Sequence, residues 1–459
     1  MPEQQQTLTI QQAINLAVQH HKAGRLPRAE SICKQILQSH PDQPVALHLL
    51  GVIAHQVGKN DDAVGMITKA LDIEPDYAEA HNNLGSVLLK LGKLEEAKIS
   101  YRKALDIKPD YAEVHTNLGN TLKDLGKPEE AIASYNKAIE LKPDFAEAHN
   151  NLGNALKELG KLEETAASYR QAIALKPDFA EAHYNLGILY HLSKKYENAA
   201  EQFELTSFKN SKYYLLRCFY YLDEKSRFFD LLDYFISEGK VDPVIGSLGC
   251  RSALRYGMER QNLFCKDPLK YVLKTNLNNQ YDFEEIFVKT AKTILNENRL
   301  PKKRQGLLTN GYQTRGNLFD LEHDFTKEIQ KIIRSEIEKY QVIFRDSEEG
   351  LIKSWPTEYS LNGWLLSMKS GGELQPHMHE KGWISGSIYI NVPSKSKAES
   401  GNLVVCIEED LMSVTENEKE SIDVITGSLC LFPASLLHYT IPFESEEERI
   451  VLAFDVVPK

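Results

Sequence analysis

The stretch that decides the fold of the first half of the chain is AHNNLGNALKELGKLEETAASYRQAIALKPD, residues 148–178. It contains two runs with helical spacing of apolar residues, a Gly-Lys turn between them and a Lys-Pro-Asp stop. The proline ends the second helix because it has no N–H to donate and its ring clashes with the preceding turn. The pattern returns at a constant step, with leucine-glycine pairs that begin at Leu50, Leu84, Leu118, Leu152 and Leu186 and prolines at Pro41, Pro75, Pro109, Pro143 and Pro177.

The constant step (84 − 50 = 34), with glycine, small residues and proline in fixed places, resembles that of tetratricopeptide repeats. About six units cover residues 8–213, and the first unit is the most divergent. The resemblance implies that each unit is a pair of helices and that the units stack into an α-solenoid with a concave groove. We therefore expect this half of the chain to hold a protein or peptide partner in its groove.

A column of amide side chains also follows the repeat, two residues before each glycine. Its members are Asn83, Asn117, Asn151 and Asn185, while Leu49 takes the place in the second unit. An amide can donate to a peptide C=O and accept from a peptide N–H, so the row suits binding of an extended backbone, and the repeats of the O-linked GlcNAc transferase look similar here. The alternative is that these amides only form hydrogen bonds between neighbouring helices.

Composition and charge limit the classes of function. The net charge is −11 and the isoelectric point about 5.8, which argues against binding to nucleic acid or to anionic membranes. The six cysteines are widely spread without a C-x-x-C pair, which is typical of reduced thiols. No apolar run reaches the length of a membrane span, and the first residues do not resemble a secretory signal. We expect a cytoplasmic protein without a membrane segment.

The period changes along the rest of the chain, and it predicts three domains. After the solenoid, residues 214–310 show helical spacing and predict a connector that caps the open end of the repeats. From residue 311 to 459 a helix over 318–344 is followed by runs with a period of two. The strand candidates are 363–370, 384–392, 402–407, 428–432, 437–441 and 449–457. Glycine and proline separate them, and the pair Gly371-Gly372 predicts a turn after the first candidate.

Alternation within these strands predicts a barrel with a polar interior. Arg449, Val451, Ala453 and Asp455 share one face of the last strand, opposite a continuous apolar face. His438 also lies on the smaller, more polar face of its strand. The fold class that we expect is therefore multidomain α plus β, with a C-terminal double-stranded β-helix, or jelly roll.

The segment Pro376-His377-Met378-His379-Glu380 carries the candidate chemistry. If the segment is an extended strand, His377 and His379 lie on the same side with Cα atoms roughly 6–7 Å apart, so both imidazoles can reach one metal ion. His438 follows much later in the chain (438 − 377 = 61), in another predicted strand. Three histidines in this arrangement, within a strand-rich segment, predict a metal centre.

Two segments around these histidines resemble a known family of enzymes. The segments GGELQPHMHEKGWISGSIYINVP (371–393) and GSLCLFPASLLHYTIPFESEEERIVLAFDVVP (427–458) resemble 2-oxoglutarate- and Fe(II)-dependent oxygenases, and most closely those fused to tetratricopeptide repeats in bacteria. The resemblance implies that His377 and His438 bind iron and that Arg449 binds the distal carboxylate of 2-oxoglutarate. A guanidinium suits that role because it binds a carboxylate through two parallel hydrogen bonds.

The chain departs from the family pattern at two positions. The superfamily usually has His-x-Asp or His-x-Glu, whereas this chain has His379. Either His379 is the third ligand of a three-histidine site, or it is no ligand, or a local bulge allows Glu380 to bind. At the second position, Val451 stands where a serine or threonine often accompanies the arginine, so another hydroxyl must contact the cosubstrate. The candidates on inward faces are Tyr389, Ser387 and Thr440.

These patterns together predict an oxygenase that hydroxylates a protein or peptide presented by the repeats. Its cofactors would be Fe(II) and 2-oxoglutarate, with ascorbate as a candidate reductant. Two alternatives stay open. One is a catalytically inactive interaction scaffold with a cupin-like barrel, which the presence of His379 in place of the usual ligand carboxylate supports. The other is an oxygenase for a small molecule or glycan that uses the repeats only for assembly.

Overall fold

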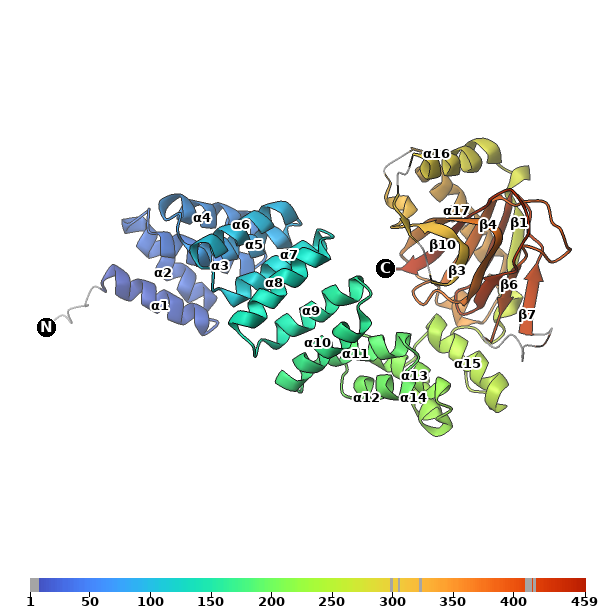
Figure 1. Cartoon of the computed structure of the whole chain (residues 1–459), viewed down its shortest axis with the longest axis horizontal. Coiled ribbons are helices and arrows are strands. Elements are labelled where there is room, and N and C mark those ends of the chain that lie inside the picture. Colours follow the sequence, from blue (N-terminus) through green and yellow to red (C-terminus); the bar gives the residue numbers. More distant parts are fainter. Residues whose placement is uncertain (1–7, 298–299, 304–305, 322–323, 409–414, 416–417) are drawn as a thin grey trace. The chain divides into compact units, whose positions relative to one another are not determined.

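The computed structural model describes residues 8–297, 300–303, 306–321, 324–408, 415 and 418–459. The chain divides into two compact units, Met1–Cys218 and Phe219–Lys459 (Figure 1). In the part that the structure describes, no helix combines the length and the apolar character that a membrane span requires. The three-part division expected from the sequence stays a prediction, and each unit is described by itself.

The first unit is the predicted solenoid of paired helices. Successive helices pack against each other, and each odd-numbered helix pairs with the helix that follows it. The helices are α1 (Ile10–Lys22), α2 (Leu26–Ser39), α3 (Pro44–Gln56), α4 (Asn60–Ile73), α5 (Ala78–Lys90), α6 (Leu94–Ile107), α7 (Ala112–Asp124), α8 (Pro128–Leu141), α9 (Ala146–Glu158), α10 (Leu162–Leu175), α11 (Ala180–Leu192) and α12 (Tyr196–Glu204). A further helix, α13 (Ser211–Tyr221), crosses the boundary between the units.

Close packing explains the glycine of the repeat. A Cβ atom at Gly119 would lie 2.5 Å from a ring carbon of Tyr135, and one at Gly153 would lie 2.5 Å from the ring of Tyr169. Both tyrosine rings are fully buried. In the four units with an aromatic residue at this place, the first helix therefore needs glycine where the ring of the second helix packs against its backbone; the glycines are Gly85, Gly119, Gly153 and Gly187.

The second unit contains helices on the outside and a ten-stranded antiparallel sheet. Its helices are α14 (Lys225–Ser237), α15 (Pro243–Tyr256), α16 (Thr290–Asn296), α17 (Asp324–Ile343) and α18 (Gly350–Lys353). Its strands are β1 (Leu273–Asn276), β2 (Lys302–Lys303), β3 (Leu308–Thr314), β4 (Tyr359–His377), β5 (Ile384–Asn391), β6 (Leu403–Cys406), β7 (Lys419–Ile422), β8 (Ser428–Pro433), β9 (Leu437–Thr440) and β10 (Arg449–Pro458). The strand order is β1-β8-β5-β10-β4-β9-β6-β7, with β3 also paired to β4 and β2 to β3.

This sheet is the expected jelly roll. The long strand β4 belongs to both of its halves, because it pairs with a different strand in each, and the sheet curves along it. One part of β4 pairs with β10, and its end pairs with β9. The prediction placed a turn at Gly371-Gly372, but β4 continues through both residues. Gly371 has φ +72°, a left-handed conformation that glycine adopts without a steric penalty, so the chain bends there within the strand.

The two faces of β10 pack into different cores, as the alternation predicts. Leu452, Phe454 and Val456 pack in one core with Ile333 and Ile337 of α17. Val451 and Ala453 belong to the opposite core, inside the barrel. The segment expected to be a helical connector also packs into the second unit, because Phe264 and Phe287 join the core of α17 and β1 pairs with β8.

Candidate metal centre

The interior of the barrel is built in layers by three neighbouring strands. Every second residue of β10, from Arg449 to Asp455, has register partners on β4 or β5, and each such set forms one layer. The layers are Arg449 with Met368; Val451 with Leu366 and Tyr389; Ala453 with Trp364 and Ser387; and Asp455 with Asn362 and Ser385. The predicted inward face of β10 thus carries a cation at one end and a carboxylate at the other.

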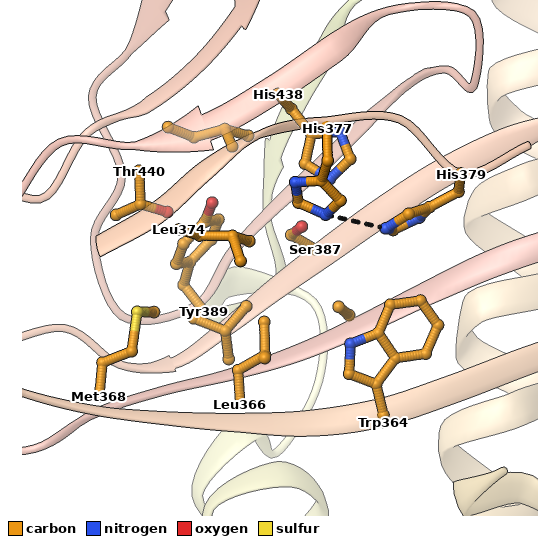
Figure 2. Close-up of a pocket in the computed structure, with 13 residues that line it drawn as sticks. Trp364, Leu366, Met368, Leu374, His377, His379, Ser387, Tyr389, His438 and Thr440 are labelled. Atoms are coloured by element: carbon orange, nitrogen blue, oxygen red, sulfur yellow. Dashed lines mark hydrogen bonds between the residues drawn. The ribbon is translucent and has the colours of Figure 1, made fainter. Parts of the chain in front are cut away.

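Three histidines meet on one side of this interior. His377 is the last residue of β4, and it is the register partner of His438 in β9. His379 lies two residues further on, in the loop before β5. One ring nitrogen from each residue can be chosen such that all three atoms lie within 4.8 Å of one another (Figure 2).

The local geometry of the His-x-His segment differs from the expectation. The sequence predicted that both histidines share one face of a continuous strand, but β4 ends at His377 and the chain turns after it. The turn directs His379 back toward the same point, since its Nε2 atom lies 3.2 Å from Nε2 of His377. Glu380 is exposed and lies outside the three-histidine group.

Hydrogen bonds fix which nitrogens of two rings carry protons. Nδ1–H of His377 donates to the carbonyl oxygen of Gln375 at 2.9 Å, because a carbonyl can only accept. Nδ1–H of His379 donates to Asp455 Oδ1 at 2.7 Å. Burial, reinforced by the neighbouring His379, lowers the pKa of His377 to about 4, so this ring is neutral near pH 7. The Nε2 atom of His377 then holds a lone pair, which faces Nε2 of His379.

This arrangement fits a metal ion. Two imidazole nitrogens that bind one metal at about 2.1 Å and at a right angle lie about 3.0 Å apart, close to the separation of the two Nε2 atoms. His438 is 5% exposed, and its Nδ1 atom is fully buried without a hydrogen-bond partner in the described part of the chain. Burial and the adjacent His377 hold the pKa of His438 well below its ordinary value. A cation bound between these rings would accept the lone pairs of ring nitrogens that otherwise face each other.

Asp455 is the site residue that the sequence-based list of candidates missed. It is 6% exposed, and it accepts hydrogen bonds from His379 and from Ser385 Oγ, the latter at 2.8 Å. Alternation had placed Asp455 on the inward face of β10 with Arg449. That signal identifies the face but not the histidine that the carboxylate meets, because β10 and the His379 loop are 76 residues apart.

A narrow cavity begins at the histidines and runs into the barrel (Figure 2). Its lining residues include Leu366, Met368, Leu374, Ser387, Tyr389, Leu403, Thr440, Val451 and Ala453. A second, more open hollow shares Trp364, His377 and His379 with the cavity. Trp364 is half-buried at this junction, with its ring centroid 5.2 Å from that of His379. The histidines can therefore be approached from outside the barrel.

Arg449 lies behind the cavity wall. It is 1% exposed, and its guanidinium carbon is 5.0 Å from the ring centroid of Tyr389, which lines the cavity. Nη1 donates to the carbonyl oxygen of Gly401, while Nε and Nη2 are buried without a hydrogen-bond partner in the described residues. Burial lowers the pKa of Arg449 and raises that of Tyr389. A buried guanidinium with two unused donor atoms can bind a carboxylate.

The amide column of the repeats forms hydrogen bonds along the solenoid. The Nδ2 groups of the later three members donate to a side chain of the preceding unit, in the pairs Asn117–Asn82 (3.0 Å), Asn151–Asn120 (3.1 Å) and Asn185–Asn150 (3.0 Å). Asn83 donates to Nε2 of His48 at 2.8 Å. Asn185 is buried, whereas Asn83, Asn117 and Asn151 are half-buried. The amides therefore form hydrogen bonds between helices of neighbouring units, as the alternative interpretation expected. Their role in peptide binding stays a prediction.

Family models match both parts of the chain. Residues 362–455 match a family described as "Putative 2OG-Fe(II) oxygenase". Models of the tetratricopeptide repeat match residues 46–79, 66–99, 85–126, 119–160 and 153–194. The chain therefore joins an array of tetratricopeptide repeats to a domain of the 2-oxoglutarate/Fe(II) oxygenase family, as the sequence predicted.

Solved structures resemble part of the chain, while no curated protein matches it. A structure of MamA is 24% identical with a TM-score of 0.33, and covers 36% of this chain and 96% of its own. PilF of Pseudomonas aeruginosa is 22% identical with a TM-score of 0.39, and covers 42% of this chain and 90% of its own. A thermophilic repeat protein of Thermus thermophilus is 24% identical with a TM-score of 0.34, and covers 40% of this chain and 100% of its own. Similarities of this size carry no information on function.

Proposed function

We propose that the second unit is an Fe(II)- and 2-oxoglutarate-dependent hydroxylase of a protein or peptide that the repeats bind. The observation that carries the proposal is the meeting of three imidazoles beside a cavity whose wall is backed by a buried arginine, Arg449, with two donor atoms that have no hydrogen-bond partner among the described residues. His377, His379 and His438 would hold the metal. Arg449 and Tyr389 would hold the far carboxylate of 2-oxoglutarate.

A bound Fe(II) would supply the reactivity toward O₂ that couples the decarboxylation of 2-oxoglutarate to succinate with the hydroxylation of a substrate C–H bond. The residues of this chain would bind the metal and the cosubstrate, hold the ligand rings in orientation and line the cavity. The imidazoles would present lone pairs to the metal, and the hydrogen bonds at Nδ1 of His377 and His379 hold these rings in orientation. The apolar side chains of Leu366, Met368 and Val451 line the cavity and would limit the access of water once the cosubstrate is bound.

The two hollows suggest separate places for the two substrates. The inner cavity leads toward Tyr389 and Arg449, which suits the dicarboxylate. The outer hollow, bordered by Trp364, Arg315 and Asn362, is open to solvent and suits a segment of a larger substrate. The amide column would bind the backbone of the same partner, because each half-buried amide has a second N–H beside the one that bonds to the preceding unit. The carbonyl oxygens of Asn83 and Asn151 each accept one hydrogen bond at 3.4 Å, from Asn82 and Asn150, and each has a second lone pair.

The experiment is formation of succinate from 2-oxoglutarate by the full-length chain with Fe(II), ascorbate and O₂. We expect turnover that is lost in His438→Ala. It should be retained in Tyr439→Phe, which alters the next residue of β9 on the opposite face. Equal turnover in the His438→Ala variant would reject the metal assignment. Absence of turnover in a chain that binds Fe(II) and 2-oxoglutarate with one-to-one stoichiometry would favour the scaffold alternative over the hydroxylase.

A further inference from the structure

Asp455 is a buried carboxylate that two side chains, His379 and Ser385, hold by hydrogen bonds. It is 6% exposed and accepts from Nδ1–H of His379 at 2.7 Å and from Oγ–H of Ser385 at 2.8 Å. Ser385 is 1% exposed, and it is the register partner of Asp455 across β5 and β10. The carboxylate is therefore fixed from two sides, and the imidazole of His379 separates it from the other two histidines.

A buried negative charge is unfavourable unless a positive charge balances it. The bond at Nδ1 leaves Nε2 of His379 facing His377, so the ring connects the carboxylate to the place where the three histidines meet. A divalent cation at that place would balance Asp455 through the ring. Carboxylate–histidine–metal arrangements fix the tautomer of the ligand and raise its basicity.

The charge of the ligand set points to the same role for Asp455. Non-heme Fe(II) oxygenases use two histidines and one carboxylate, which places one negative charge next to the metal. Three neutral imidazoles provide no such charge, although they fill the same number of positions. In this chain the carboxylate of Asp455 stands one ring further out, hydrogen-bonded to Nδ1 of His379, and His379 occupies the place of the usual ligand carboxylate.

We propose that Asp455, held by Ser385, supplies through His379 the negative charge that a ligand carboxylate supplies in a two-histidine-one-carboxylate site. The inference rests on the proposed metal centre, and it assigns Asp455 and Ser385 as positioning residues for His379. The departure from His-x-Asp is then a relocation of the charge by one imidazole and not its loss.

The test measures the affinity of the full-length chain for Co(II), added alone under anaerobic conditions, together with the visible spectrum of the bound Co(II). Asp455→Asn keeps the size of the side chain and an oxygen that accepts from Nδ1–H, but removes the charge. We expect it to weaken binding about 10- to 100-fold and to shift the Co(II) bands. Ser385→Ala keeps the charge but removes one hydrogen bond, so we expect a loss of several-fold and a smaller shift.

A double-variant cycle shows whether Asp455 acts through His379. In a His379→Ala background, Asp455→Asn should change Co(II) affinity less than twofold, because the connecting ring is gone. The matched control is Glu336→Gln, which neutralises a buried carboxylate of the same unit that binds Tyr281 and Lys339 away from the histidines. Its Co(II) affinity and spectrum should equal those of the unsubstituted chain.

The outcomes separate this inference from the proposed function. If the unsubstituted chain does not bind Co(II), the metal centre itself is rejected and the inference with it. If the unsubstituted chain binds and Asp455→Asn binds equally well with the same spectrum, the inference alone is overturned. Should Asp455→Asn not fold by near-UV circular dichroism, Ser385→Ala decides, and an unchanged affinity and spectrum in that variant would overturn the inference.

Discussion

His377 and His438 are register partners on adjacent antiparallel strands, and their ring centroids lie 4.3 Å apart. They are distant in the sequence, and the pairing of β4 with β9 is what brings them together. Their proximity is therefore a consequence of strand register. A slip of one residue would direct one of the rings to the other face of the sheet.

Metal should stabilise the unsubstituted chain and not the His377→Ala or His438→Ala variants. A ligand at 100 times its dissociation constant adds about 2.7 kcal/mol, which for a unit of this size raises the unfolding temperature by roughly 5–10 °C. Differential scanning calorimetry with and without Co(II) measures the shift. A shift of equal size in either variant would show that the ion binds elsewhere.

Arg449→Lys should weaken binding of 2-oxoglutarate to the metal-loaded chain. Lysine keeps the charge but cannot form two parallel hydrogen bonds, and the loss of one charge-assisted bond is worth about 1.5–3 kcal/mol, or roughly 10- to 150-fold in affinity. Anaerobic isothermal titration calorimetry measures the effect. Arg251→Lys is the control, because Arg251 is also buried but is paired with Glu408 at 3.0 Å. Equal affinities in both variants would remove Arg449 from the site.

Gly401→Ala should disturb the same arginine from the backbone side. Gly401 has φ +73°, its carbonyl accepts from Arg449, and an added Cβ would lie 2.6 Å from Nη1 of Arg449. We expect a loss of stability of about 1–2 kcal/mol from backbone strain and, in addition, at least tenfold weaker binding of 2-oxoglutarate. The strain alone is measured with Gly257→Ala, where φ is +63° and no heavy atom lies within 4 Å of the added Cβ. If the two variants bind 2-oxoglutarate alike, the contact with Arg449 is irrelevant.

Replacing Asn117 and Asn151 by alanine tests the amide column. Both substitutions remove a hydrogen bond to the preceding unit, so a stability loss of about 1 kcal/mol each is expected from the fold alone. If the column also holds a peptide backbone, hydroxylation of a protein substrate should fall while uncoupled consumption of 2-oxoglutarate stays the same. Thr165→Ala, on the second helix of its unit, removes a part-buried hydrogen bond outside the column and should leave both reactions unchanged. A parallel loss of both reactions would speak for damage to the fold.

Acid should destabilise the first unit through His48. This buried ring accepts from Asn83 at Nε2 and contacts Tyr77 Oη at Nδ1, and burial lowers its pKa from 6.5 to about 4. The unfolded chain binds the proton more tightly, so stability falls as the pH drops below 6.5 and levels off near pH 4, by at most about 3 kcal/mol.

The unfolding temperature of the full-length chain between pH 4 and pH 7.5 measures this effect. His48→Gln should be less stable than the unsubstituted chain at pH 7.5, and the difference should shrink toward pH 4. The control is His40→Gln at an exposed position. A difference that stays constant with pH would reject the role of His48.

Local patterns in the sequence predicted the features that depend on local contacts. The repeat period predicted the solenoid because glycine and tyrosine meet within a single unit. Alternation predicted the two faces of β10, which pack in different cores as expected. The same reasoning predicted a turn at Gly371, because a glycine pair is typical of turns. Nothing in the local sequence shows that β4 pairs with β10 before Gly371 and with β9 after it.

Contacts between distant segments were out of reach. Alternation placed Asp455 inside the barrel but could not show that it meets His379, since this depends on the turn after His377 and on the register of β5 with β10. In the same way, β1 lies in a segment with helical spacing, and only its pairing with β8 makes it a strand. A short strand of this kind is determined by its partner more than by its own sequence.

The proposed site unites three histidines and one arginine around Fe(II) and 2-oxoglutarate. An anaerobic titration of the full-length chain with Fe(II) and then 2-oxoglutarate, followed by visible absorption, tests this union, because chelation of Fe(II) by a 2-oxoacid is coloured. We predict one Fe(II) per chain and an absorption band that appears only when both are present, that is absent in His438→Ala, and that requires more 2-oxoglutarate in Arg449→Lys. A chain that binds no Fe(II), or a band that is unchanged in His438→Ala, would show that the histidines do not form this site.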